Sequence, residues 1–325
     1  MTPQSASPST QKLDAALGML SPLEDTMPMV PGAVEDHWAT ETQPARLPST
    51  RALALKARKP SHSAANGDTA LHQAVFDDAP KRVSALLGAG AGVDALNGGG
   101  DTPLLVAAQL DRYECCRLLL AAGADPSRRN AGGFPPLALA ASKNAARCLV
   151  MISIELHQRG GSLDAFCGGY TALHWACIQG SAACVAALLQ AGADVNLESE
   201  PDGETALSKA VQYGAVDCVE ALLEESAVIV DAHDHCGRTA LHQAARGGHA
   251  DIVTLLLNRG AEVHVRDDEG VTPMGYASSR SFSVAHRLAL HGALKFDWRS
   301  PFAPVPAEAS SFFACFDAEA PGCTP

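Results

Sequence analysis

The sequence has few aromatic residues, few charged residues and no long apolar run. Aromatic residues make up 5% of the 325 residues and charged residues 18%, whereas 47% are hydrophobic. A chain of this length can bury a sizeable core, and its many alanines favour close packing of helices over a β-sandwich. Because no apolar stretch approaches the roughly 18 residues that a membrane span needs, we expect no membrane span.

The ten cysteines do not have the spacing of a metal site or of a disulfide framework. No CxxC pair occurs, so a zinc ribbon is unsupported. Most cysteines lie inside apolar helical stretches, such as Cys184 in AACVAALL and Cys218 in VDCVEALL. We therefore expect buried thiols in a reducing compartment. The N-terminus shows neither a secretory signal nor the composition of a transit peptide, which predicts an intracellular protein in the cytoplasm, the nucleus or both.

Positive charge is also scarce. Residues 61–294 carry 16 basic and 26 acidic side chains, which places −10 of the net charge of −12 in this part of the chain. A body this acidic repels phosphate backbones, so nucleic-acid binding is not expected. A neutral or basic protein is the more favourable partner.

The chain contains an internal repeat. A seven-residue pattern recurs at intervals of 33 to 36 residues. Its seven copies are TALHQAV from Thr69, TPLLVAA from Thr102, PPLALAA from Pro135, TALHWAC from Thr171, TALSKAV from Thr205, TALHQAA from Thr239 and TPMGYAS from Thr272. In four of them a glycine follows the threonine by 21 residues, at Gly90, Gly123, Gly192 and Gly260.

Each unit predicts two short helices. Thr171 can cap a helix whose apolar stripe begins at Leu173, and Gly180 interrupts that helix after about two turns. A second helix passes through Leu188, and Gly192 can adopt the left-handed conformation that stops it. Neither helix can bury its apolar face alone, so neighbouring units must stack and the ends must be capped.

These residues resemble the ankyrin repeat family over roughly residues 63–294, most closely from Gly169 to Asn196 and from Gly237 to Val263. The resemblance implies a mainly α fold, an ankyrin-repeat solenoid of stacked helix-turn-helix units joined by short β-hairpin fingers. The expected parts are a disordered segment over residues 1–60, an ankyrin repeat domain over residues 61–294 and an aromatic tail or cap over residues 295–325. The expected repeats start near residues 64, 97, 130, 166, 200, 234 and 267.

Three units depart from the pattern. In the third, Pro135 replaces the threonine and the glycine comes about four residues late, which predicts a second helix about one turn longer. The fifth has Ser226 where the glycine is expected, and this leaves the end of its second helix open. The seventh is more polar and irregular, as is typical of a C-terminal capping unit.

A histidine recurs at one repeat position, as His72, His174 and His242. Catalysis by such a histidine would need a nucleophile or a metal nearby and a third group to orient the ring. Recurrence at one position favours a structural role instead. The resemblance implies a hydrogen bond within the turn beside the threonine.

The residue after this histidine varies in size and charge between units. The resemblance implies that this position and the finger tips line a concave groove for a partner, where tryptophan and tyrosine are favoured. The alternative is that Trp175 only packs against a neighbouring finger. The predicted contact residues are Gln73, Val106, Leu139, Trp175, Lys209, Gln243 and Tyr276 on the helices, with Tyr170, Glu204 and Arg238 on the fingers.

Acidic residues gather in two fingers, between Glu198 and Glu204 and between Asp267 and Glu269. They could steer a basic partner or simply keep the surface soluble, and both explanations stay open. The stretch RDDEG lacks the alternation of a calcium loop, so no metal is expected.

The sequence therefore predicts a monomeric, non-enzymatic scaffold or adaptor that binds another protein through the groove. The alternative is a stoichiometric inhibitor or regulatory subunit that masks a surface of its partner. No cofactor and no catalysis are expected, because no phosphate-binding GxxxxGK[ST] loop and no GxSxG elbow occurs. The aromatic tail after Lys295 either caps the last repeat or docks a second protein.

Overall fold

The structure is a computed structural model that describes residues 67–278 and 281–295. The predictions for residues 1–60 and for the aromatic tail lie outside these ranges. The chain divides into two compact units, the first ending at Val228 and the second beginning at Ile229.

The described part of the first unit consists of five helix pairs. Each pair has a short first helix followed by a second helix. The pairs are α3 (Ala70–Phe76) with α4 (Pro80–Gly88), α5 (Pro103–Gln109) with α6 (Tyr113–Ala121), α7 (Pro136–Ser142) with α8 (Ala146–Gln158), α9 (Ala172–Ile178) with α10 (Ala182–Ala191), and α11 (Ala206–Gln212) with α12 (Val216–Glu224).

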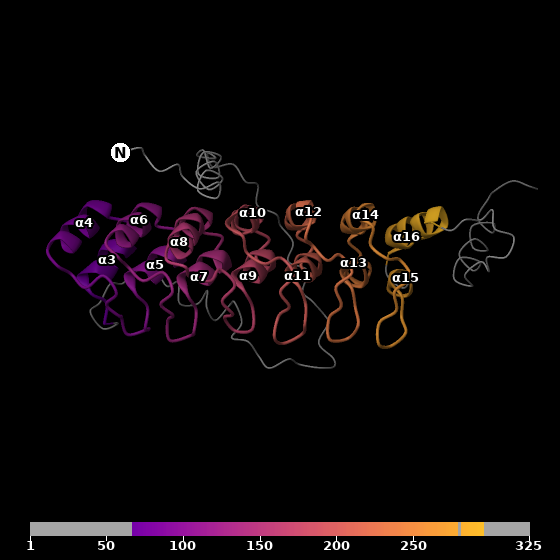
Figure 1. The fold of residues 1–325 in the computed structure, drawn as a ribbon, viewed down its shortest axis with the longest axis horizontal. Helices are drawn as coiled ribbons and strands as arrows, with labels where there is room; N and C mark the ends of the chain where they lie inside the picture. The colour runs from indigo at the N-terminus through magenta and orange to yellow at the C-terminus, as the bar shows by residue number, and fades with distance from the viewer. Residues whose placement is uncertain (1–66, 279–280, 296–325) are drawn as a thin grey trace, which may run out of the picture. The chain divides into compact units, whose positions relative to one another are not determined.

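The helices of this unit form two layers. Helix α7 contacts the first helices α5 and α9, and α8 contacts the second helices α6 and α10 (Figure 1). Leucines of both layers, such as Leu104, Leu119, Leu173 and Leu188, are completely buried. Burial of one such side chain stabilises the fold by about 1.5–3 kcal/mol, so each pair depends on its neighbours.

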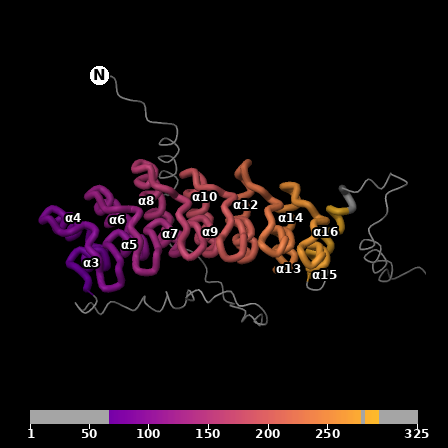
Figure 2. The backbone as a smooth tube through the Cα atoms, turned by 60° about the horizontal axis from the view of Figure 1, so that its bottom comes forward, coloured from indigo at the N-terminus to yellow at the C-terminus, as the bar shows by residue number. Residues whose placement is uncertain are grey.

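The loops that join one pair to the next project from the first-helix layer as fingers. Three of them matter below: residues 122–135, 159–171 and 192–205. Figure 2 shows the fingers of this unit side by side. Among the described residues, β structure is limited to two isolated antiparallel bridges, Cys167 with Tyr170 and Glu198 with Thr205.

A threonine begins four of the five first helices in this unit. The side chains of Thr69, Thr102, Thr171 and Thr205 each accept a hydrogen bond from the backbone N–H three residues further on. Such a cap contributes about 1 kcal/mol. Helix α7 begins after Pro135, which makes no side-chain cap.

The turn between the two helices of a pair requires a left-handed residue. Gly180 has φ 68°, whereas the corresponding residues Asp78, Asp111 and Asn144 have φ between 47° and 57°. Aspartate and asparagine tolerate this region better than other non-glycine residues. Asn144 is also tied to the next pair, because the hydroxyl of Ser181 donates to its side-chain oxygen.

The prediction of a longer second helix in the third repeat is confirmed. Helix α8 has 13 residues, whereas the second helices of the other four pairs in the first compact unit have 9 or 10. In the fifth repeat α12 ends at Glu224, and Glu225 takes an extended conformation instead of a left-handed cap. The chain thus leaves this helix without a glycine.

The second unit contains two helix pairs in its described part, α13 (Ala240–Gly247) with α14 (Ala250–Asn258) and α15 (Pro273–Ser278) with α16 (Phe282–Lys295). Helix α13 contacts α15, and α14 contacts α16. Arg287 of α16 donates to the carbonyl of Ala250 at 2.8 Å, which fastens the last helix to α14. No helix in the described parts of the chain is long and apolar enough to cross a membrane.

Candidate functional site

The predicted contact residues on the first helices form a row, which we call the first-helix row. In the first unit, Val106, Leu139, Trp175 and Lys209 are exposed by only 2–8%. Gln73 is half-buried. The buried members offer a partner little area, so their main contacts must be sought inside the protein.

Trp175 lies between two fingers. Its ring centroid is 5.7 Å from that of Phe134 in the 122–135 finger and 5.5 Å from that of Tyr170 in the 159–171 finger. The indole N–H donates to the carbonyl of Cys167 at 3.4 Å. Tilted and edge-on ring pairs of this kind contribute about 0.5–1.5 kcal/mol each. Trp175 thus braces both fingers, and its contact with a partner stays a prediction.

Lys209 is the centre of a buried ion-pair cluster. Its ammonium group donates to Asp202 Oδ2 at 2.7 Å and also pairs with Glu204. The side chains of Lys209 and Glu204 are exposed by only 5% and 3%. Burial by itself lowers the pKa of Lys209, but the charge of Glu204 and the hydrogen bonds to both carboxylates outweigh it and raise that pKa. The lysine therefore stays charged and holds the 192–205 finger against α11.

Tyr170 joins the ion-pair cluster of Lys209 to the aromatic rings around Trp175. The ammonium nitrogen of Lys209 lies 5.2 Å from the centroid of the Tyr170 ring, within the range of a cation–π contact. The ring also contacts Trp175 and His174. A continuous set of side chains therefore links α9, α11 and their fingers. This arrangement gives the surface around it a fixed shape.

The second unit uses the same positions in a similar way. The side-chain nitrogen of Gln243 lies 3.3 Å from Asp234 Oδ2, and the same carboxylate pairs with Arg238. The hydroxyl of Tyr276 donates to Asp267 Oδ2 at 2.7 Å. Burial and the neighbouring Asp267 raise the pKa of Tyr276 to about 12, so the phenol stays neutral.

The recurring histidines connect each helix start to the following finger. In the fourth helix pair, His174 Nδ1 lies 2.8 Å from the Thr171 hydroxyl and His174 Nε2 lies 3.0 Å from the Glu204 carbonyl. A carbonyl can only accept, so Nε2 carries the proton and Nδ1 accepts from the threonine. His72 and His242 make the equivalent pairs of contacts. We call this arrangement the threonine–histidine clamp.

This geometry makes His174 a poor general base. Burial lowers the pKa of His174 to about 4, and burial also lowers the pKa of His242. Both ring nitrogens of His174 are already engaged by protein groups. A ring that is buried, neutral and bonded at both ends has no free position from which to take a proton from a substrate.

The accessible side chains lie one turn further along the first helices. Residues four positions apart share a helix face, and the position four residues after the first-helix row is exposed or half-exposed throughout the first unit. Tyr213, which follows Lys209, has 58% of its surface exposed. We call these residues the second-turn row: Asp77, Leu110, Lys143, Gln179 and Tyr213. The i+4 spacing in the sequence could have identified them.

The predicted stop glycines all have left-handed backbones. Gly90, Gly123, Gly192 and Gly260 have φ between 84° and 94°. A Cβ atom at any of them would meet nothing within 4 Å, so the conformation and not the space requires glycine. The part of the chain that the structure describes contains no group of three or more side chains that could hold a metal ion.

Comparisons with known proteins agree on the kind of fold. The family model for ankyrin repeats in three copies matches residues 37–130, 137–232, 198–267 and 229–297. The ankyrin repeat domain of Bcl-3, described as a unique member of the IκB protein family, is 30% identical with a TM-score of 0.62, covering 69% of this chain and 99% of that chain. The human ASB11 ankyrin repeat domain is 26% identical with a TM-score of 0.60, covering 69% and 98%. Among curated proteins, none matches the sequence significantly.

Proposed function

We propose that this chain, which belongs to the ankyrin repeat family, is a non-enzymatic scaffold or adaptor that binds a partner protein through the face formed by its first helices and fingers. Ankyrin repeats mediate protein–protein interaction. The resemblance implies that this face lines a concave groove. The finer role is supported by how the residues of this face are held.

The observation that carries the proposal is that the exposed side chain of Tyr213 lies next to residues that are held in fixed positions. Tyr213 is 58% exposed, and it lies one turn from Lys209, which the two carboxylates of the 192–205 finger hold in place. An aromatic side chain on a rigid support contributes a large contact area at a small entropic cost. Gln179, on the preceding first helix, is exposed as well.

The predicted contact residues take two roles in this proposal. The buried ones, Trp175 and Lys209 among them, fix the positions of the fingers and touch a partner only along their edges. The half-buried ones, Gln73 in the first unit and Arg238 and Tyr276 in the second, present more of their surface. The second-turn row supplies the remaining contacts in the first unit.

The chemistry of the cysteines supports a reducing compartment, and we place the protein in the cytoplasm or the nucleus. The eight cysteines of the described residues are all free thiols, and seven of them are buried. Burial raises the pKa of Cys115 and Cys184 to about 11, so both remain protonated at neutral pH. They act as small apolar side chains of the core.

Affinity capture followed by quantitative mass spectrometry tests the binding face. The variant is Tyr213→Ala, and the matched control is Tyr113→Ala, a half-buried tyrosine at the start of the second helix α6. We expect one or a few proteins to be depleted about tenfold with Tyr213→Ala, which is a loss of about 1.4 kcal/mol, and to be retained with Tyr113→Ala. Equal capture by all three proteins would contradict the proposed face.

A second assay distinguishes a scaffold from a stoichiometric inhibitor. The purified chain is titrated into an activity assay of the captured partner. A scaffold leaves that activity intact at saturation, whereas an inhibitor abolishes it at one equivalent. Loss of activity at one equivalent would show that the chain is an inhibitor and not a scaffold. The proposed binding face would still stand.

A further inference from the structure

The third helix pair lacks the threonine–histidine clamp. Pro135 stands at the threonine position and Ala138 at the histidine position. In the fourth pair the same two positions are occupied by Thr171 and His174, whose ring is buried. The third pair therefore has a methyl group where the fourth has an imidazole.

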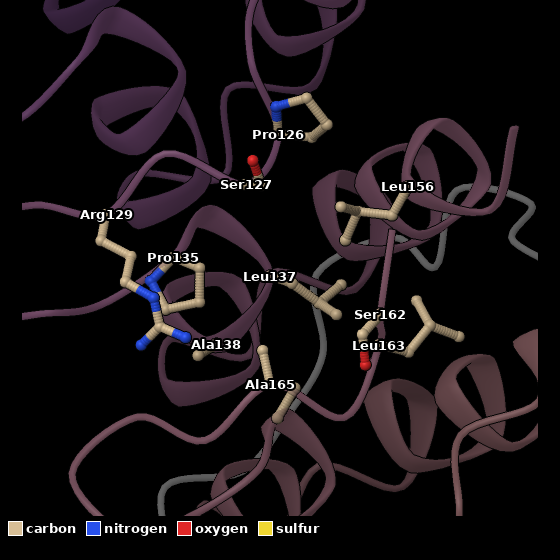
Figure 3. Close-up of a pocket in the computed structure, with 11 residues that line it drawn as sticks. Pro126, Ser127, Arg129, Pro135, Leu137, Ala138, Leu156, Ser162, Leu163 and Ala165 are labelled. Atoms are coloured by element: carbon tan, nitrogen blue, oxygen red, sulfur yellow. The ribbon is translucent and has the colours of Figure 1, made fainter. Parts of the chain in front are cut away.

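A cavity of about 210 Å³ lies beside these residues (Figure 3). Pro135 and Ala138 line it, together with Leu156 from the extra turn of α8. Leu163 and Ala165 of the 159–171 finger form another part of the wall. Beside Ala138 and the longer α8 there is thus a space between the 122–135 finger and the 159–171 finger, which is lined mainly by apolar side chains and also by Ser127 and Ser162.

The size of the cavity indicates what it can hold. Pockets for drug-sized ligands span roughly 300–1,000 Å³, which is larger than this space. An engineered apolar cavity of roughly 150 Å³ in another protein holds one benzene molecule. A space of about 210 Å³ with mainly aliphatic walls therefore suits one aliphatic side chain of a partner and not a whole cofactor.

Arg129 gives the opening of the cavity a positive charge. Its side chain lines the cavity and is exposed. The Nη1 group donates to the carbonyls of Gly133 at 3.0 Å and Phe166 at 2.7 Å, so the guanidinium bridges the two fingers. Among the described residues, no carboxylate pairs with Arg129, and Nε and Nη2 have no hydrogen-bond partner. These N–H groups can receive a carboxylate in a bidentate pair.

Three other charged groups lie near the opening. Arg128 is exposed beside Arg129 and interacts electrostatically with Asp125. Asp125 is bound to the hydroxyl of Ser127 at 2.6 Å, and Asp164 accepts the backbone N–H of Asp194. Neither carboxylate forms an ion pair with Arg129, whose Nη1 donates only to backbone carbonyls.

We infer that this cavity binds an aliphatic side chain of a partner segment that carries a carboxylate beside it, and that Arg129 pairs with that carboxylate. The inference rests on the proposed function, because it takes the partner to be a protein. It adds the chemistry of the recognised segment: leucine or isoleucine next to aspartate or glutamate. It also assigns a role to the insertion in the third pair, which the repeat pattern by itself does not require.

Selection from a random peptide library displayed on phage, with the full chain as target, tests this inference. We expect the selected peptides to be enriched in an aliphatic residue next to an acidic one. Binding of a selected peptide is then measured by fluorescence anisotropy. Ala165→Leu fills the cavity and Arg129→Gln removes the charge, and each is expected to weaken binding at least about tenfold.

Two matched controls separate the site from general effects. Arg128→Gln removes the neighbouring charge, and Ala122→Leu adds the same bulk at an exposed position at the end of α6. Both controls are expected to bind the peptide as the wild type does. Circular dichroism shows beforehand that all four variants are folded.

The outcomes also separate this inference from the proposed function. Selection of peptides without the aliphatic–acidic pair, or unchanged binding by Ala165→Leu and Arg129→Gln, overturns the cavity as a docking site. If Tyr213→Ala nevertheless loses its captured partner, the proposed function stands alone. If the peptides depend on the cavity while Tyr213→Ala captures everything, the cavity stands and the proposed face fails.

Discussion

The third and fourth helix pairs are neighbours in the first unit, yet different contacts tie each pair to the finger that follows it. In the fourth pair His174 bonds to the Glu204 carbonyl of the 192–205 finger. In the third pair the position of that histidine is Ala138, and the exposed Arg129 reaches the Phe166 carbonyl of the following finger. One tie is buried and neutral, and the other is exposed and charged.

This difference shows where the repeat allows change. The fourth pair keeps the repeat pattern, and its polar groups are occupied by structural bonds. The third pair has lost the clamp and gained a turn of α8, and it has both a cavity and a guanidinium with free donors. A repeat that departs from its pattern is therefore the better place to look for a specific ligand.

The largest expected effect concerns the ion-pair cluster that joins the 192–205 finger, which follows the fourth pair, to α11 of the fifth pair. Lys209→Met leaves Glu204 buried without its cation, and we expect the free energy of unfolding to fall by about 3–5 kcal/mol. Urea unfolding measures the loss, and hydrogen exchange should place it in the 192–205 finger. Lys143→Met, at a half-buried lysine of the third pair, should change stability by less than about 0.5 kcal/mol.

A double variant sharpens this result. Lys209→Met with Glu204→Met replaces the buried pair by apolar side chains, and most of the lost stability should return. If the double variant is as unstable as Lys209→Met, the cluster acts through its shape and not through an unpaired charge.

The threonine–histidine clamp predicts that folding stability depends on pH. Of the third and fourth pairs, only the fourth has this clamp. Burial lowers the pKa of His174 from 6.5 to about 4 in the folded chain. Below pH 6.5 the unfolded chain binds a proton that the folded chain does not, so stability falls as the pH drops from about 6.5 to about 4. The full loss corresponds to roughly 3 kcal/mol.

NMR titration of the His174 ring measures this pKa directly, and unfolding at several pH values measures the loss. His174→Gln keeps a polar side chain but cannot titrate, so its stability should change less over the same range. A His174 ring that titrates near 6.5 would show that the clamp is open to water and would remove the contrast with the third pair.

The comparison can also be reversed by building the clamp into the third pair. Pro135→Thr with Ala138→His supplies the hydroxyl and the imidazole that the fourth pair has. The ring should enter the cavity and form up to two hydrogen bonds, which raises the free energy of unfolding by about 1 kcal/mol. The same variant should no longer bind the selected peptides. A clear loss of stability would show that the cavity does not correspond to a missing histidine.

The sequence predicts much of this fold because the repeat depends on local rules. Threonine caps, left-handed glycines and helical spacing act within a few residues, so the helix pairs and the longer α8 follow from the order of residues. The cavity beside Ala138 could not be predicted, since it arises from the distance between two fingers that are separated in the chain. No local rule specifies that distance.

The candidate contact residues show the same limit. The position of Trp175 on its helix follows from the repeat, but its burial by Phe134 and Tyr170 depends on which residues the adjacent fingers carry. The buried state of Lys209 likewise requires two acids from one finger. The accessibility of a side chain in the first-helix row thus depends on its own helix pair and on the adjacent fingers. This explains why the exposed residues lie one turn further along, in the second-turn row.

The smallest expected effect concerns the turn between the two helices of each pair, where the third pair has Asn144 at φ 57° and the fourth has Gly180 at φ 68°. Asn144→Gly relieves a left-handed backbone but loses the hydrogen bond from Ser181, and glycine has more freedom in the unfolded chain. These contributions nearly cancel, so urea unfolding should show a change within about 0.5 kcal/mol. In a double-mutant cycle with Ser181→Ala, the coupling energy between the two side chains should be about 1 kcal/mol. A loss above 2 kcal/mol would mean that Asn144 is a principal link between the third and fourth pairs, and the second-helix layer would then compensate for the clamp that the third pair lacks.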